Sequence, residues 1–393
     1  MPDTGLAFHP LTFVAERDGV LVGRADTDSY ALLPEDGVEL LRRLVDGMPL
    51  DQAAAWYDTA YGETVDIADF VETMQELGFV KEPGEADAEQ PPPVRFQAWG
   101  RAAFSPFGWI CYALITVLAV AVMVRDPHVR PQPGNVFFVG SLVAVQLSLT
   151  VLQMPMALWH EWFHVLAGRR LGLPTSLGVG RRLFFFVFET RLAGLLGVPR
   201  SRRYLPFLAG MLGDAVLFGL LTLGAAADFT AGPAWIGRLA LALAYTILPR
   251  LAWQFLLFLR TDLYYVLTTA LGCANLHEVS SALLRHRLRR LPLVPGGSWT
   301  EPERWTDRER ALAPWFALLT AAGTLVLLVT MVFVTVPLTV EFVHRLAGGI
   351  AHGSIGDGRF WDSTVSLLIA LLEFVLLPLL AGRGRRRTAT TAA

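Results

Sequence analysis

Long apolar stretches constrain the fold of this chain more than any other feature of its sequence. Six of them can cross a hydrocarbon core about 30 Å thick, and they lie at residues 103–124, 136–158, 204–226, 234–259, 311–337 and 363–381. The mean hydropathy of +0.44 agrees with this pattern. The chain is therefore predicted to be an α-helical polytopic membrane protein with six transmembrane helices. Because the first stretch begins beyond residue 100, we expect no cleavable N-terminal signal peptide.

The charges divide the chain into unlike parts. Residues 1–90 hold 5 of the 33 Lys and Arg residues but 20 of the 35 Asp and Glu residues, whereas the remainder is basic. This split predicts an acidic soluble domain at 1–82, a Pro-rich linker at 83–99, a membrane domain at 100–382 and a basic, disordered tail at 383–393.

The arginines predict the orientation in the membrane. The loops after the second and fourth apolar stretches and the C-terminal tail are rich in arginine, whereas the loops after the first and third stretches hold few. Positive residues mark the cytoplasmic side of a membrane. Both termini of a multi-pass cell-membrane protein are therefore expected in the cytoplasm.

Two histidines lie four residues apart in MALWHEWFHVLAG, at the end of the second apolar stretch. On a helix, His160 and His164 project from one face, about 6 Å apart along the axis. That spacing suits two nitrogens that bind one Zn²⁺, and Glu161 completes the H-E-x-x-H arrangement of zinc hydrolases. The alternative is a pair of interfacial histidines with a snorkelling glutamate. Titratable groups in a membrane usually mark function, so we favour the metal site.

A catalytic zinc ion needs a third protein ligand and an open position for water. By the predicted topology, Asp262 lies at the cytoplasmic end of the fourth stretch, at the same depth as the two histidines. Asp214 lies deeper, in the third stretch, whereas His344 and His352 fall in an external loop and are excluded. We therefore expect Asp262 to complete a site for one zinc ion per chain. The alternative is a solvated helix-end carboxylate paired with Arg260.

These motifs resemble those of the site-2-protease family of intramembrane zinc metalloproteases, and especially its bacterial peptide zinc metalloprotease branch. There, H-E-x-x-H is followed by Asp-Gly-Tyr-Tyr running into Leu-Gly-x-Pro-Asn-Leu, and this chain has DLYY at 262–265 and LGCANL at 271–276. The resemblance covers roughly residues 100–381 and implies that Asp262 binds the metal and Asn275 the substrate. Leu263, Thr269 and Ala274 replace a Gly, an Asp and a Pro of the family, which affects the shape of the loop.

A third segment, LAGMLGDAV, resembles the family's Ala-Gly-Pro-x-x-Asn segment. Met211 stands for the proline, and Asp214 for the asparagine that helps to hold the reacting carbonyl. The resemblance thus implies a substrate-binding role for Asp214, which an acid can fill only if it is protonated or paired.

The segment RRLFFFVFET, residues 181–190, is aromatic and β-branched without a helical period. This composition predicts a strand or hairpin. Such a strand could pair with the backbone of an extended substrate, with Phe186 and Phe188 in contact with it. The alternative is a plain re-entrant segment seated in the membrane.

The acidic domain shows a different pattern. Residues 10–32 alternate, and Arg17-Asp18-Gly19 is typical of a turn between two strands. Three helical patterns follow, at residues 35–44, 50–57 and 67–77, the last capped by Asp66 and closed by Gly78. A ribbon with three short helices predicts a small α+β winged helix-turn-helix domain, but its net negative charge argues against nucleic acid as its partner.

Residues 8–82 resemble the peptide-binding recognition element of pathways for ribosomally made, post-translationally modified peptides (RiPPs). The resemblance rests on ALLPEDGVELLRRLVDG and ELGFV. It implies that a leader peptide binds as an extra strand against an exposed β-edge and a helix. The alternative is a generic regulatory or stability domain.

Together these patterns predict a membrane zinc endopeptidase that cleaves a precursor peptide during RiPP maturation or export. Glu161 would take a proton from the zinc-bound water and return it to the leaving amine. The predicted partners are the precursor peptide and the lipid bilayer. One alternative is a site-2-type protease that cleaves a membrane-anchored regulator. The other is a non-catalytic peptide-binding chaperone or transporter, against which the intact Glu161 argues.

Overall fold

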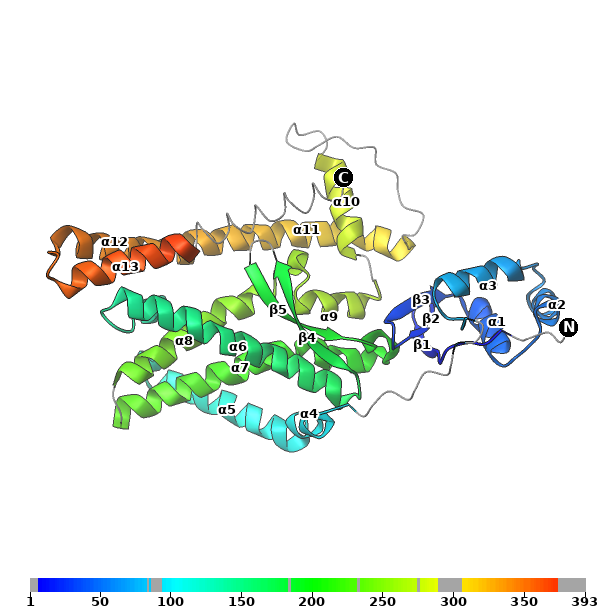
Figure 1. Ribbon diagram of the computed structural model, residues 1–393, viewed down its shortest axis with the longest axis horizontal. Coiled ribbons are helices and arrows are strands. Elements are labelled where there is room, and N and C mark those ends of the chain that lie inside the picture. The colour runs from blue at the N-terminus through cyan, green and yellow to red at the C-terminus, as the bar shows by residue number, and fades with distance from the viewer. Residues whose placement is uncertain are drawn as a thin grey trace.

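The structure is a computed structural model that describes residues 6–82, 85, 94–182, 185–231, 234–273, 276–288 and 306–373. These residues are mostly helical, and a small N-terminal domain lies at one end of an elongated helical body (Figure 1). The predicted tail at 383–393 lies outside the described residues, as does most of the linker.

The N-terminal domain contains one sheet and three helices. Its antiparallel strands have the order β1-β2-β3, and they are β1 Thr12–Glu16, β2 Gly19–Arg24 and β3 Ser29–Leu33. The helices are α1 Glu35–Val45, α2 Leu50–Tyr61 and α3 Ile67–Glu76. The predicted turn at residues 17–19 is present, because Glu16 pairs with Gly19. Asp66 caps α3 by accepting hydrogen bonds from two backbone amides of its first turn, as expected.

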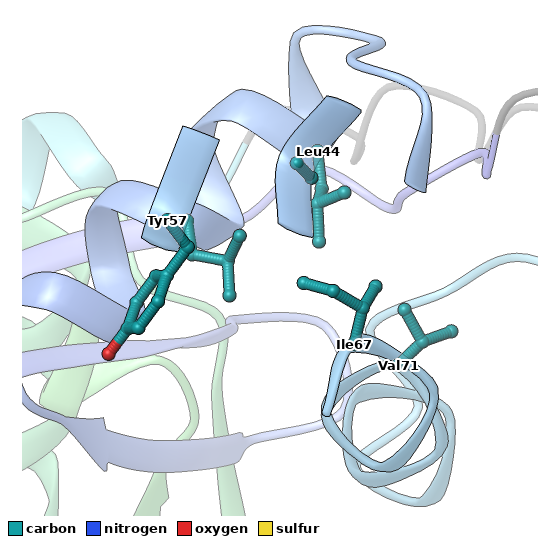
Figure 2. Packing of buried hydrophobic residues seen from close by; sticks show 6 residues of the cluster. Leu44, Tyr57, Ile67 and Val71 are labelled. Carbon is teal, nitrogen blue, oxygen red and sulfur yellow. The ribbon is translucent and has the colours of Figure 1, made fainter. Parts of the chain in front are cut away.

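The core of this domain forms where the apolar faces of the three helices meet. Leu44 of α1, Tyr57 of α2, and Ile67 and Val71 of α3 belong to one buried cluster, and the side chains of Leu44, Ile67 and Val71 point toward one another in Figure 2. A second cluster joins the sheet to α1 and α3 through Val22, Leu41 and other buried apolar residues. The helices α1 and α3 thus cover the sheet and α2 packs on them, because each helix has only one apolar face to bury.

Among the described residues of the body, four helices are long and apolar enough to cross a membrane, which indicates a membrane protein. They are Pro106–Arg125 (α5), Leu142–Arg170 (α6), Arg200–Asp228 within α7 (Arg200–Ala231), and Asp307–His352. The last is built from α11 Asp307–Thr330, a π-helical segment η5 Met331–Thr335 and α12 Val336–His352. Many of their exposed side chains are large and apolar, as a lipid environment favours, and Phe107 and Phe333 are 74% and 73% exposed.

Two further helices fall in the fourth and sixth predicted stretches. They are α8 Ala234–Trp253 and α13 Gly358–Leu371. His344 and His352 lie in a helix and not in the expected loop, so the predicted loop conformation was wrong, whereas their side of the membrane stays a prediction. The helix runs without a break from the π-helical segment η5 into α12, with Pro337 as the second residue of α12.

Shorter elements surround the end of α6. The helix α4 Gln97–Ala103 and the antiparallel hairpin of β4 Thr175–Arg182 and β5 Phe185–Leu192 pack against α6. The helix α7 packs against α5, α6 and α8, and also against α9 Asp262–Leu271. The helix α10 Leu276–Leu288 follows. The predicted hairpin is therefore present and begins earlier than residue 181, and α7 is the element that brings α6 and α9 together.

Candidate metal centre

Three side chains from two elements converge beside α7. His160 and His164 lie one turn apart on α6, and Asp262 is the first residue of α9. The two Nε2 atoms are 3.2 Å apart, and each is 3.3 Å from Asp262 Oδ2. Both histidines are buried, with 8% and 6% of their surface exposed. The three residues that the sequence selected thus form one cluster that could hold a metal ion.

The dimensions of this cluster suit a small tetrahedral ion. Ligand atoms bonded at about 2.0–2.1 Å to such an ion lie about 3.3 Å from one another. The three edges between His160, His164 and Asp262 are all 3.2 or 3.3 Å long. In addition, Asp262 Oδ2 is buried and receives no hydrogen bond from the described residues. An acceptor left in this state is costly, and a cation would satisfy it.

A glycine of α7 keeps the donor atoms free. A Cβ on Gly210 would lie 2.3 Å from His164 Nε2 and 2.4 Å from His160 Nε2, well inside van der Waals contact. Only a residue without a side chain fits there while both imidazoles keep these positions. Sequence reasoning missed Gly210, although its place in LAGMLGDAV, one of the segments singled out, was a signal.

The Nδ1 atoms of both imidazoles, on the side away from Asp262, also have hydrogen-bond partners. His160 Nδ1 lies 2.9 Å from Asp214 Oδ2, and His164 Nδ1 lies 2.7 Å from the carbonyl oxygen of Pro206 on α7. Hydrogen bonds from Nδ1 to these acceptors fix the tautomer in which Nε2 carries the free lone pair. Both histidines therefore present the nitrogen that a metal would need.

Asp214 is completely buried and doubly paired. Besides His160, its carboxylate accepts hydrogen bonds from Arg250 of α8, whose Nε lies 3.0 Å from Oδ2 and whose Nη2 contacts Oδ1. The sequence resemblance required Asp214 to be either protonated or paired, and in the structure it is paired. Contact between Asp214 and a substrate stays a prediction. Sequence reasoning missed Arg250, although a cation inside an apolar stretch was a signal.

Glu161 points toward the hairpin. Its Oε2 accepts a hydrogen bond of 2.8 Å from Thr190 Oγ1 of β5, and the same hydroxyl lies 3.1 Å from its carbonyl oxygen. The carboxylate is therefore bound to β5, at the last residue of the predicted substrate-pairing segment. Sequence reasoning did not single out Thr190.

The loop before α9 orients Asp262. The side-chain oxygen of the buried Gln254 accepts a hydrogen bond from the Asp262 amide at 3.1 Å, and its carbonyl oxygen accepts one from Thr261 Oγ1 at 2.6 Å. Arg260 has a φ of 53° and pairs with Glu278 at 3.2 Å. Arg260 therefore pairs with Glu278 and not with Asp262, so the structure does not have the alternative arrangement.

Two of the other residues predicted to bind substrate lie on the hairpin strand β5. Phe188 of β5 is half-buried and pairs with Val179, and the backbone of Phe186 pairs with that of Arg181. Asn275 lies outside the described residues. A comparison of the chain with protein-family models, curated proteins and solved structures found no match.

Proposed function

We propose that this chain is a membrane zinc endopeptidase that cleaves a precursor peptide during the maturation or export of a RiPP. The observation that supports it most is the triangle formed by His160, His164 and Asp262, because its edges suit tetrahedral zinc. The glutamate that follows His160 is the second support, since a metal site of binding function alone needs no adjacent base.

The chain's own residues would divide the work of hydrolysis. Zinc bound at the triangle would supply a Lewis acid and lower the pKa of water toward about 7. Glu161 takes the proton from the attacking water and passes it to the leaving amine. Thr190 holds the Glu161 carboxylate through its hydroxyl. An extended substrate aligned with the β4–β5 hairpin would bring its scissile carbonyl toward Glu161 and the metal centre.

We also propose six spans with both termini in the cytoplasm. The 20 residues of α8 reach about 30 Å, the thickness of a hydrocarbon core. The charge of Arg250 on α8 is neutralised by Asp214, as an ionisable pair inside a membrane requires. The sixth span is the stretch 363–381, whose described part belongs to α13.

The N-terminal domain is proposed to be a winged helix-turn-helix that binds the leader of the precursor. Its contacts with the body support this role. Glu16 of β1 lies 2.8 Å from Arg203 Nη1 and 3.4 Å from Arg200 Nε, both in the first turn of α7. In the loop after the hairpin, the Gly194 amide donates to Asp28. A leader peptide bound to this domain would therefore lie close to the β4–β5 hairpin and to the first turn of α7.

The central experiment replaces the base and keeps the metal ligands. Purified Glu161→Gln protein should retain about one zinc ion per chain, whereas cleavage of a quenched-fluorescent peptide library should fall by about 10²-fold or more. Glu341→Gln on α12 is the matched control, because Glu341 forms an exposed pair with Arg345 and lies outside the proposed site; it should keep both properties. Removal of zinc by a chelator should abolish cleavage and added zinc should restore it.

The same assay separates the alternatives. Undiminished cleavage by the Glu161→Gln protein, or a wild-type protein that binds zinc but cleaves nothing, would overturn the endopeptidase and favour a peptide-binding chaperone. Cleavage of membrane-anchored proteins, but of none of the short precursors encoded beside the gene, would favour a site-2-type regulator protease.

A further inference from the structure

Three arginines from separate elements line a cavity of about 450 Å³ near the end of α6. They are Arg101 of α4, Arg170 at the last position of α6, and Arg202 in the first turn of α7, and Ser201 and Pro206 are also part of the wall. The lining of this cavity includes none of the three candidate metal ligands, although the carbonyl oxygen of Pro206 also contacts His164. No part of the proposed hydrolysis uses these guanidinium groups.

Tight packing brings two of the three cations together. A Cβ on Gly100 of α4 would lie 2.4 Å from the carbonyl oxygen of Leu166 and 2.9 Å from the amide nitrogen of Arg170. The backbone of α4 therefore lies directly against the end of α6, which sets Arg101 beside Arg170. Like charges held close to one another are unfavourable unless an anion lies between them.

Two neighbouring arginines have carboxylate partners that the arginines of the cavity lack. In the same turn of α7, Arg200 and Arg203 both pair with Glu16 of the N-terminal domain. By contrast, Arg101, Arg170 and Arg202 pair with no carboxylate among the described residues, although they share one cavity. The positive end of the α7 dipole adds to the potential of that cavity.

Aromatic side chains place the cavity at the level of a membrane surface. Phe96 and Trp99, beside Arg101, are 46% and 63% exposed, and Phe96 packs against Trp162 of α6. Exposed aromatic residues of this kind gather at the boundary between hydrocarbon and water. Below them, the outward face of α5 is apolar, with Phe107 74% exposed.

We propose that this cavity binds the phosphate of an anionic phospholipid, with the acyl chains against the apolar outer surface of α5 and α6. Basic pockets at the ends of membrane helices are suited to such headgroups. Each arginine near a membrane surface strengthens the binding of an anion about fivefold, so three should give on the order of 100-fold.

The test uses the full-length protein in dodecyl maltoside and follows its thermal unfolding. Increasing dioctanoyl phosphatidylglycerol should raise the unfolding midpoint in a saturable way, whereas dioctanoyl phosphatidylcholine should not. In the R101Q/R170Q/R202Q protein, the lipid concentration for half of the effect should rise on the order of 100-fold. Equal stabilisation of both proteins would overturn the site.

Two controls keep the result interpretable. The R383Q/R385Q/R386Q protein loses the same charge from the C-terminal tail and should respond as the wild type does; a loss there would mean that total charge decides. Arg101→Gln alone changes one exposed side chain, so it tests the site if the triple variant does not fold, and an unchanged response would count against the proposal. Inorganic phosphate should stabilise far less than the lipid, because it lacks acyl chains; equal stabilisation would replace the lipid with a free anion.

Discussion

At the scale of single residues, Gly210 decides whether the histidines can bind an ion. We expect Gly210→Ala to abolish metal binding, because its methyl group would occupy the space beside both Nε2 atoms. Zinc content after purification, measured by atomic emission, checks this. Gly224→Ala is the matched control, since Gly224 lies in the same helix and a Cβ there meets nothing within 4 Å. Full zinc content in Gly210→Ala would show that α7 can move away from α6.

Asp214 acts on the candidate metal centre indirectly, through its contact with His160 Nδ1. We expect Asp214→Asn to weaken zinc binding about 10- to 100-fold, the effect usual for a group that orients a ligand. Competition with a chromophoric chelator measures this affinity. Asp228→Asn is the control, because Asp228 lies on α7 but accepts from the Gly237 amide.

Arg250 provides a second test of the same arrangement. Arg250→Lys keeps the charge but loses the two-pronged contact with Asp214, so an intermediate affinity is expected. If neither Asp214→Asn nor Arg250→Lys changes zinc affinity, packing of α6 alone orients His160.

At the scale of elements, the N-terminal domain is held together partly by a bond between two helices. Tyr57 of α2 donates a hydrogen bond to Asp36 of α1. This bond raises the pKa of Tyr57 to about 12 and lowers the pKa of Asp36. The stabilisation from Tyr57 is therefore present below pH 10 and lost as the pH rises through about 12. That from Asp36 is present above its ordinary pKa of about 4 and lost at lower pH.

We expect Tyr57→Phe to destabilise the domain by about 1.5–3 kcal/mol at neutral pH, the usual value of a hydrogen bond to a charged group. The variant should also flatten the loss of stability at both pH extremes. Hydrogen exchange of α1 and α2 amides in the full-length protein measures this. Tyr61→Phe is the control, because Tyr61 is exposed and lies 3.4 Å from Glu39. An unchanged pH profile in Tyr57→Phe would mean that other groups set the pH dependence.

At the scale of the whole molecule, Glu16 joins the N-terminal domain to the helices of the site. It pairs with Arg200 and Arg203, and Arg200 also donates to the carbonyl oxygens of Thr269 and Ala270 at the end of α9. The helices α7 and α9 carry Gly210 and Asp262. The domain is therefore fastened to the two elements that complete the metal centre around α6.

We expect Glu16→Gln to loosen this attachment without loss of zinc, because no metal ligand lies in the domain. Processing of a full-length precursor should fall at least several-fold, whereas cleavage of a short peptide should change little. Glu39→Gln is the control, since Glu39 forms an exposed pair with Arg43 inside the domain. Equal losses for precursor and short peptide would show that Glu16 acts on the site itself rather than on substrate recognition.

Local patterns in the sequence determined much of this protein. Apolar length predicted the helices α5, α6 and α7, and turn and capping residues predicted the β1–β2 hairpin and the three helices of the N-terminal domain. The separate strand β3 was not predicted. The four-residue spacing set His160 and His164 on one face, and a matching depth in the membrane selected Asp262. Each of these inferences needs only neighbouring residues or the constraint that the bilayer imposes on every span.

Only the tertiary structure decided the contacts between distant residues. Gly210 faces the imidazoles, Arg250 neutralises Asp214, and Thr190 holds Glu161, across 29 residues or more in each case. The continuation of the helix through His352 was also not predicted. No local period encodes such contacts, because they depend on which faces of α6, α7, α8 and β5 meet. Helix packing chose those faces, and with them the groups that surround the candidate metal centre.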